Sequence, residues 1–193
     1  MTDKPTSLPT FKRVVTGHNS DGAAIVSETG LPPVIQHLQA VPGTVFYEIW
    51  NSSEMPVAID NGTDPTLKPL QLSPTANGSV IRVVDIPPDS QQNAISEAAA
   101  ADAFAEIGQA SAHQVNSPKS NTATRHKLMH RTETLDYGVV LCGEVWLVLD
   151  DEEIHLQQGD IVVQRGTNHA WSNRTETMAR MMFVLLDGQF RLP

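Results

Sequence analysis

The sequence is poor in cysteine, in basic residues and in long apolar runs, and each shortage excludes a class of protein. The single cysteine, Cys142, cannot form a disulfide within the chain, which argues against a small disulfide-stapled secreted domain. A formal net charge of −9, from 13 basic and 22 acidic residues, disfavours nucleic acid or an anionic membrane as a partner. The apolar runs are only strand-sized, and residues 1–13 contain no apolar signal segment. We therefore expect a cytoplasmic protein.

What the sequence does contain is strand-forming segments. Its 193 residues suffice for one domain with an extension and a real core. Residues 138–164 alternate short β-forming runs with turn residues, which predicts a row of antiparallel hairpins. Residues 30–43 contain three prolines and predict an extended crossing, whereas 51–78 predict a long surface loop. Turn signals and β-branched content predict further strands at 12–16, 23–26, 44–50, 79–86 and 179–188.

One segment predicts a helix. Residues 93–108 are rich in alanine and place apolar side chains about one turn apart, and Asn93 or Ser96 could cap the helix start. The polar stretch 109–124 predicts a loop. The whole segment 88–125 therefore forms an insertion between two strands. Such an insertion could act as a lid, although a plain covering structure is the favoured interpretation.

Two histidines flank the strand-rich segment. His130 lies just before it and His169 just after it, each beside a turn or a strand end. Side chains at strand ends can converge at the mouth of a closed sheet, so these two imidazoles could share one metal ion. The competing interpretation is a pair of hydrogen-bonded structural histidines.

The residues around His169 resemble the second conserved motif of the cupins. That motif has a glycine at a turn, a short strand, and then G-x-x-H-x-x-x-N. Gly159, Gly166, His169 and Asn173 occupy these positions here. The sequence departs from the pattern in two respects: Arg165 stands where cupins usually carry proline, and the spacing between the glycines is one residue shorter.

The first cupin motif is only partly present. Counting back from Gly143, the family's first histidine is His130, its second is replaced by Thr132, and its glutamate by Asp136. The resemblance therefore implies three metal ligands instead of the usual three histidines and one glutamate: His130, Asp136 and His169. Glu133 is a nearby substitute for the missing imidazole, because Asp136 is one methylene shorter than glutamate. Thr132 could hold a metal-bound water or simply pack.

The resemblance also implies the fold class, which is all-β: a single-domain cupin double-stranded β-helix, or jelly-roll barrel, with an N-terminal β extension and one helical insertion. Residues 1–78 would form the arm and the extra strands, 79–187 the barrel with its insertion at 88–125, and 188–193 a tail. Cupin-like proteins are commonly dimers, so a homodimer is expected. Extra strands from the extension would also cover a sheet edge that is otherwise prone to aggregate.

The implied cofactor is a divalent transition metal: iron, manganese, zinc or nickel. Two histidines and one carboxylate would leave open positions for substrate or dioxygen. Glu133 or Tyr137 would assist in proton transfer.

A small-molecule ligand is the expected partner, bound at the barrel mouth. Trp146 and Trp171 could line its pocket, although aromatic packing in the core is the alternative use for such side chains. Arg165 could bind a substrate carboxylate as a planar fork, or it could form an exposed salt bridge.

The first functional hypothesis is a metal-dependent enzyme acting on a small organic molecule, with dioxygenase-, decarboxylase- or isomerase-like chemistry, and thus an oxidoreductase, lyase or isomerase. Two alternatives remain open. One is a cupin that binds a small molecule without chemistry, and the other is a metal-independent isomerase or cyclase in which His130 is the base. The cupin fold hosts many activities, so the fold alone does not choose between them.

Overall fold

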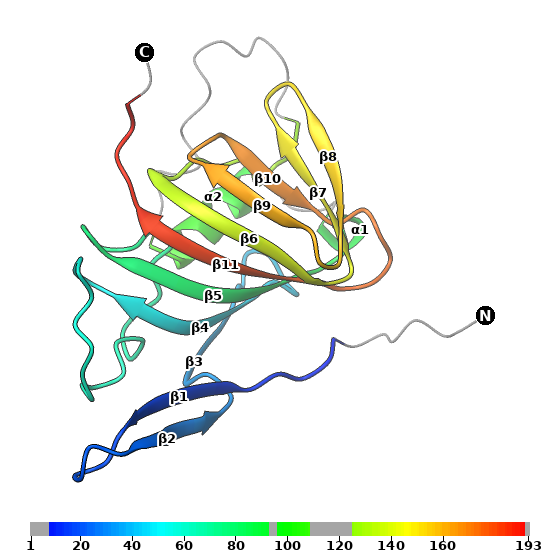
Figure 1. Cartoon of the computed structure of the whole chain (residues 1–193). Helices are drawn as coiled ribbons and strands as arrows, with labels where there is room; N and C mark the ends of the chain where they lie inside the picture. Colours follow the sequence, from blue (N-terminus) through cyan, green and yellow to red (C-terminus); the bar gives the residue numbers. More distant parts are fainter. Residues whose placement is uncertain (1–7, 93–95, 109–124, 192–193) are drawn as a thin grey trace.

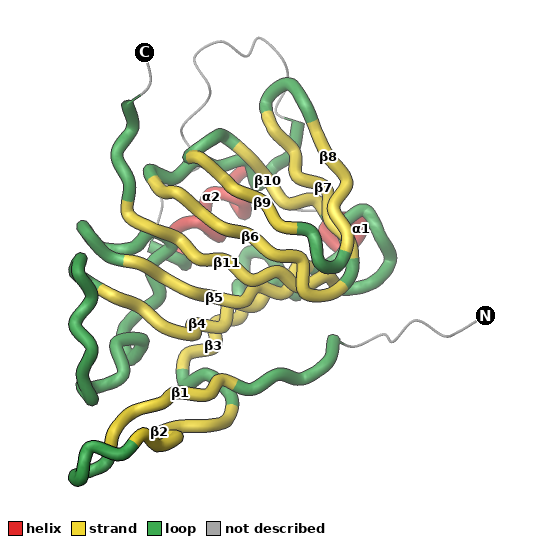
Figure 2. Tube along the Cα trace, viewed as in Figure 1, coloured by secondary structure: helices red, strands yellow, loops and turns green. Residues whose placement is uncertain are grey.

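Residues 8–92, 96–108 and 125–191 are described by the structure, a computed structural model dominated by antiparallel β-sheet (Figures 1 and 2). The largest sheet has six strands in the order β3-β4-β5-β11-β6-β9, and a second sheet has three in the order β10-β7-β8. The six strands are β3 (Val34–His37), β4 (Val45–Ser52), β5 (Ser79–Ile86), β11 (Ala179–Asp187), β6 (Thr134–Cys142) and β9 (Ile161–Arg165). The three strands are β10 (His169–Ser172), β7 (Glu144–Leu149) and β8 (Glu153–Gln157). This arrangement confirms the predicted all-β class, with two antiparallel sheets.

The predicted row of hairpins is correct only for its middle member. β7 and β8 pair directly across their turn, whereas β6 and β9 pair with each other in the opposite sheet. The chain therefore changes sheets at Gly143 and again at Gly159. Gly143 has φ +77°, and a Cβ there would lie 3.0 Å from the carbonyl oxygen of Met178, so only glycine is accommodated without a shift. These two crossings, which the periodicity of the sequence does not reveal, produce the double-layered barrel.

The N-terminal strands extend the barrel sheet. β4 pairs with β5, and the predicted crossing at 30–43 contains the edge strand β3. The predicted hairpin is confirmed as β1 (Arg13–His18) and β2 (Ala24–Gly30), both somewhat longer than predicted. This hairpin forms a separate two-stranded sheet beside the barrel (Figure 1). Arg13 joins it to the barrel side through an ion pair with Asp64, 2.6 Å between Nη2 and Oδ2.

The predicted helix is confirmed as α2 (Glu97–Glu106), preceded by the single turn α1 (Asp89–Gln92). The backbone N–H of Ala99 donates to Ser96 Oγ at 3.1 Å, so Ser96 is the N-cap. The Glu106 carboxylate accepts hydrogen bonds from the backbone N–H groups of Gln39 and Ala40, both at 2.8 Å. These contacts hold the helix end in place and favour the covering interpretation over the lid. Asn93 and the predicted loop 109–124 lie outside the described residues.

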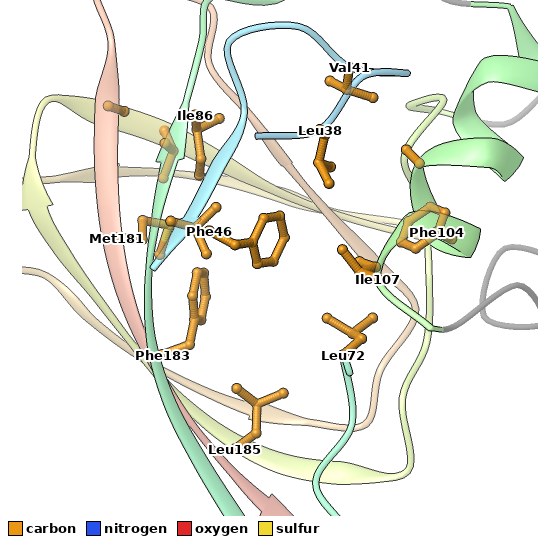
Figure 3. Close-up of a cluster of buried hydrophobic side chains, with 14 of the residues drawn as sticks. Leu38, Val41, Phe46, Leu72, Ile86, Phe104, Ile107, Met181, Phe183 and Leu185 are labelled. Carbon is orange, nitrogen blue, oxygen red and sulfur yellow. The ribbon is translucent and has the colours of Figure 1, made fainter. Parts of the chain in front are cut away.

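The core lies between the six-stranded sheet and α2. Figure 3 shows Phe46, Met181 and Phe183 from the sheet facing Phe104 and Ile107 of the helical segment. The segment 51–78, predicted as a surface loop, contributes buried side chains to this core: Leu70 and Leu72. Among the helices of the described residues, none is long and apolar enough to cross a membrane.

Candidate active site

A cavity of about 130 Å³ lies where α2 packs against the inner faces of the sheets. Most of its wall is apolar, and four aromatic side chains contribute: Phe46, Phe104, Trp171 and Phe183. An apolar cavity of about 150 Å³ can hold a molecule the size of benzene, so this cavity suits a one-ring organic ligand. The polar side chains on its wall are Thr44, Arg82, Gln92, His130, Thr132, Asp136 and His169.

His130 and His169 lie side by side on this wall. Their backbones exchange two N–H···O hydrogen bonds of 2.9 Å, and their ring centroids are 4.3 Å apart. In each ring Nδ1 lies 3.0 Å from a backbone carbonyl oxygen, that of Leu128 for His130 and that of Thr167 for His169. A carbonyl only accepts, so each neutral ring carries its proton on Nδ1 and has Nε2 as its acceptor nitrogen.

Burial keeps His169 neutral. Its exposed fraction is only 3%, and this burial, together with the neighbouring His130, lowers the pKa of His169 well below its usual value of 6.5. The Trp171 and His169 rings pack in a T-shaped arrangement, with 5.5 Å between their centroids. A neutral imidazole in an apolar wall can accept a proton from a bound molecule.

The pKa of Asp136 is shifted in the opposite direction, upward. It projects from β6 into the cavity with 6% exposure, and burial raises its pKa to about 6, against the opposing effects of a hydrogen bond with Thr134 and the charge of Arg82. Its Oδ1 atom is buried and has no hydrogen-bond partner among the described residues. A carboxyl group with this pKa can donate or accept a proton near neutral pH.

Arg82 on the cavity wall belongs to a buried ion pair that the sequence analysis did not predict. Arg82 on β5 and Glu48 on β4 are 1% and 2% exposed, with 3.1 Å between Nε and Oε1. The pair had a signal in the sequence, because Arg82 shares one face of its strand with Val80, Val84 and Ile86. A charged residue on an otherwise apolar strand face marks either a buried pair or a binding site.

Comparison with known proteins shows where this arrangement belongs. The chain is 33% identical over 190 residues to phomopsin biosynthesis cluster protein C' of Diaporthe leptostromiformis, covering 94% of this chain and 81% of that protein. It is 30% identical to the cupin-domain-containing oxidoreductase virC of Hypocrea virens, covering 91% of this chain and 75% of that protein. The chain belongs to the cupin superfamily.

Comparison with protein families and with solved structures gave two further matches. The family described as "Cupin domain" matches residues 113–185. Among solved structures, a Cupin 2 conserved barrel domain protein from Salinispora arenicola is 14% identical, with a TM-score of 0.34, covering 66% of this chain and 71% of that chain.

The metal ligands predicted for this cupin are only partly assembled. His130 and His169 supply two imidazole nitrogens, but the part of the chain that the structure describes holds no group of three His, Cys, Asp or Glu side chains that could bind one ion. Asp136 lines the same cavity without joining such a group, and Thr132, in the place of the missing histidine, lies 2.8 Å from the Thr134 hydroxyl. These donors do not fit a three-ligand metal centre in this arrangement.

Five predicted site residues remain, and they differ in whether they line the cavity. Trp171 lines the cavity, whereas four others do not: Glu133, Tyr137, Trp146 and Arg165. Strand alternation explains two of these positions, since buried Asp136 and Gln164 each precede an outward residue, Tyr137 and Arg165. The carboxylate of Glu133 accepts a hydrogen bond from the backbone of Phe190 at 2.7 Å, and Trp146 stacks on His155 at 4.2 Å.

Proposed function

We propose that this cupin is an enzyme that transfers protons to and from a small, mainly apolar organic molecule held in the cavity. One observation carries the proposal: a neutral imidazole, His169, and a carboxyl group with a pKa near 6, Asp136, line the same apolar pocket. A buried carboxyl group with a pKa shifted toward the working pH is a mark of acid–base catalysis, and an imidazole that stays neutral at that pH keeps one ring nitrogen able to accept a proton.

The two groups divide the roles. His169 has its acceptor nitrogen at Nε2, because Nδ1 donates to the Thr167 carbonyl, so it can take a proton from the bound molecule. Asp136 can return a proton from its carboxyl form or accept one from its carboxylate form. The apolar wall keeps bulk water from competing for either proton.

The relatives support an enzymatic role. One is named a cupin-domain-containing oxidoreductase, and others are named as proteins of the phomopsin and oryzines biosynthesis clusters. Such names are in keeping with a reaction on a small organic compound.

Deuterium exchange tests the proposal. One-ring ketones and hydroxy compounds are incubated with the protein in D₂O, and exchange of carbon-bound hydrogen is followed by NMR. We expect the parent to accelerate exchange into at least one compound, and His169→Gln and Asp136→Asn each to lose most of that acceleration. His155→Gln, on the barrel surface, is the matched control and is expected to behave like the parent. If compounds that bind show no accelerated exchange, the protein binds small molecules without this chemistry.

A divalent transition metal is a second candidate partner, favoured by one observation. Both imidazoles donate Nδ1–H to backbone carbonyls, which is the usual way of orienting a metal-binding histidine. An ion held by His130 and His169 alone would need a further ligand from water or from the bound molecule. Elemental analysis of the purified protein decides this: near-stoichiometric iron, manganese, zinc or nickel that is lost in His169→Ala but kept in His155→Ala would establish the metal. Absence of metal from the parent after reloading would exclude it.

A further inference from the structure

We infer that Arg82 anchors a neutral oxygen acceptor, such as a ketone or ester carbonyl, on the molecule bound in the cavity. The inference rests on the proposed function, because it assigns a polar contact to the ligand of the same cavity. It adds a recognition residue that neither cupin motif contains, since Arg82 lies on β5, outside both motifs.

Two of the three side-chain nitrogens of Arg82, Nε and Nη1, lack a hydrogen-bond partner among the described residues. Nε still has an ion-pair partner, Glu48 Oε1 at 3.1 Å, and Nη2 donates to the Gln71 carbonyl at 2.7 Å and to Glu48 Oε2 at 3.5 Å. Nη1 is buried and has no hydrogen-bond partner among the described residues. A buried, charged N–H group without a partner is unfavourable, so a ligand that supplies an acceptor there gains affinity.

Nη1 lies on the side of the guanidinium away from Glu48. Nε and Nη2 form the edge of the planar guanidinium that faces Glu48 and Gln71, so Nη1 lies away from that edge. Arg82 is part of the cavity wall, whereas Glu48 is not and instead borders a separate polar pocket. The Phe46 ring, also on the cavity wall, lies 5.8 Å from the centre of the guanidinium.

The charges around Arg82 favour a neutral acceptor. Glu48 already balances the positive charge of the guanidinium within the pair. Asp136, on the same cavity wall, adds a second nearby negative charge whenever it is ionised. An anionic ligand would therefore be repelled and would lose its hydration without a free countercharge, whereas a carbonyl needs only the N–H donor.

Three one-ring probes separate these possibilities: acetophenone with a neutral carbonyl, ethylbenzene with no oxygen, and benzoate with a negative charge. Dissociation constants are measured by NMR titration of the parent, of Arg82→Lys, and of the double variant Glu48→Leu with Arg82→Met. Lysine keeps a positive charge beside Glu48 but lacks the second nitrogen. The double variant removes both charges, so neither is left buried without a partner.

We expect the parent to bind acetophenone on the order of tenfold more tightly than ethylbenzene or benzoate, as one hydrogen bond from a charged donor would give. Both variants should keep ethylbenzene binding and lose the preference for the ketone.

Three results would overturn the inference while leaving the cavity as a binding site: equal binding of acetophenone and ethylbenzene by the parent, preference for benzoate, or a ketone preference that survives in both variants. Failure of all three probes to bind the parent would overturn the small-molecule cavity itself, and with it the proposed function.

Discussion

Two buried arginine–carboxylate pairs lie on neighbouring strands of the large sheet, and they differ in how completely their polar atoms are hydrogen-bonded. Arg180 on β11 lies directly opposite Asp85 on β5, and Arg82 on β5 lies directly opposite Glu48 on β4. Every nitrogen of Arg180 is bound: Nε and Nη2 donate to Asp85 at 2.5 and 2.8 Å, and Nη1 donates to the Pro9 carbonyl at 2.5 Å. Arg82 also forms an ion pair with the residue opposite it, but its only hydrogen bond to Glu48 is the one from Nη2 at 3.5 Å, and both Nε and Nη1 lack a hydrogen-bond partner among the described residues.

The two pairs lie on opposite faces of the sheet. Arg82 and Asp85 are three residues apart on β5 and therefore project to opposite sides. The outer pair is covered by Tyr47, whose hydroxyl donates to Asp85 at 3.1 Å, and by Phe11, whose ring lies 4.9 Å from the Arg180 guanidinium. The inner pair faces the cavity. Complete hydrogen bonding indicates a structural pair that fixes the N-terminal segment to the barrel, and incomplete bonding indicates a place for a ligand.

The largest effect is expected from breaking the outer pair. Arg180→Met leaves Asp85 buried without its partner, so the free energy of unfolding should fall by about 3–5 kcal/mol. Urea denaturation measures the change. Arg165→Met removes an exposed arginine from the same sheet and should change the free energy by less than about 0.5 kcal/mol. Similar losses for the two variants would mean that the outer pair is not the structural one.

A smaller effect, with a defined pH dependence, is expected at Asp136. The folded-state pKa of Asp136, about 6, lies above the usual value of 3.8 for this side chain, so between these values the folded state binds more protons than the unfolded state, and stability falls as pH rises. The penalty is complete above pH 6 and absent below pH 3.8. Asp136→Asn removes the charge and should raise the free energy of unfolding by about 2–3 kcal/mol at pH 8 and by little at pH 3.5.

Urea denaturation across this pH range, with Asp151→Asn as the exposed control, checks the prediction at Asp136. An equal effect of Asp136→Asn at both pH values would show that burial does not raise the pKa of this carboxyl group. The inner face of the sheet would then resemble the outer face in this respect.

Much of the fold was predictable because it depends on local signals. The strand at 79–86 and the helix cap at Ser96 follow from β-branched content and capping chemistry, and both are confirmed. The sheet changes at Gly143 and Gly159 were not predictable in this way, because a glycine turn has the same local signature in a hairpin and in a crossing. Homodimer formation and a cytoplasmic location stay predictions.

The candidate site was also predictable only in part. His130 and His169 stand out in a motif, and the structure brings them together through a backbone bridge. Arg82 stands out only as a charged residue on an apolar strand face, and its partner could not be assigned, because its meeting with Glu48 depends on the register between β4 and β5, which includes an irregularity just after Glu48. Register is a property of two strands at once, so the sequence of either strand alone does not reveal the pair.

The smallest effect on stability is expected when the inner pair is replaced as a whole. Glu48→Leu with Arg82→Met loses the Arg82–Gln71 hydrogen bond, but it also removes two desolvated charges, so the free energy of unfolding should stay within about 1 kcal/mol of the parent or rise. The matched change at the outer pair, Asp85→Leu with Arg180→Met, also removes partners of Pro9 and Tyr47 and should be clearly destabilising. Urea denaturation of the two double variants makes the comparison directly. An inner variant that loses as much stability as the outer one would make Arg82 a structural residue, whereas an unchanged fold with lost ketone preference would separate its binding role from any role in stability.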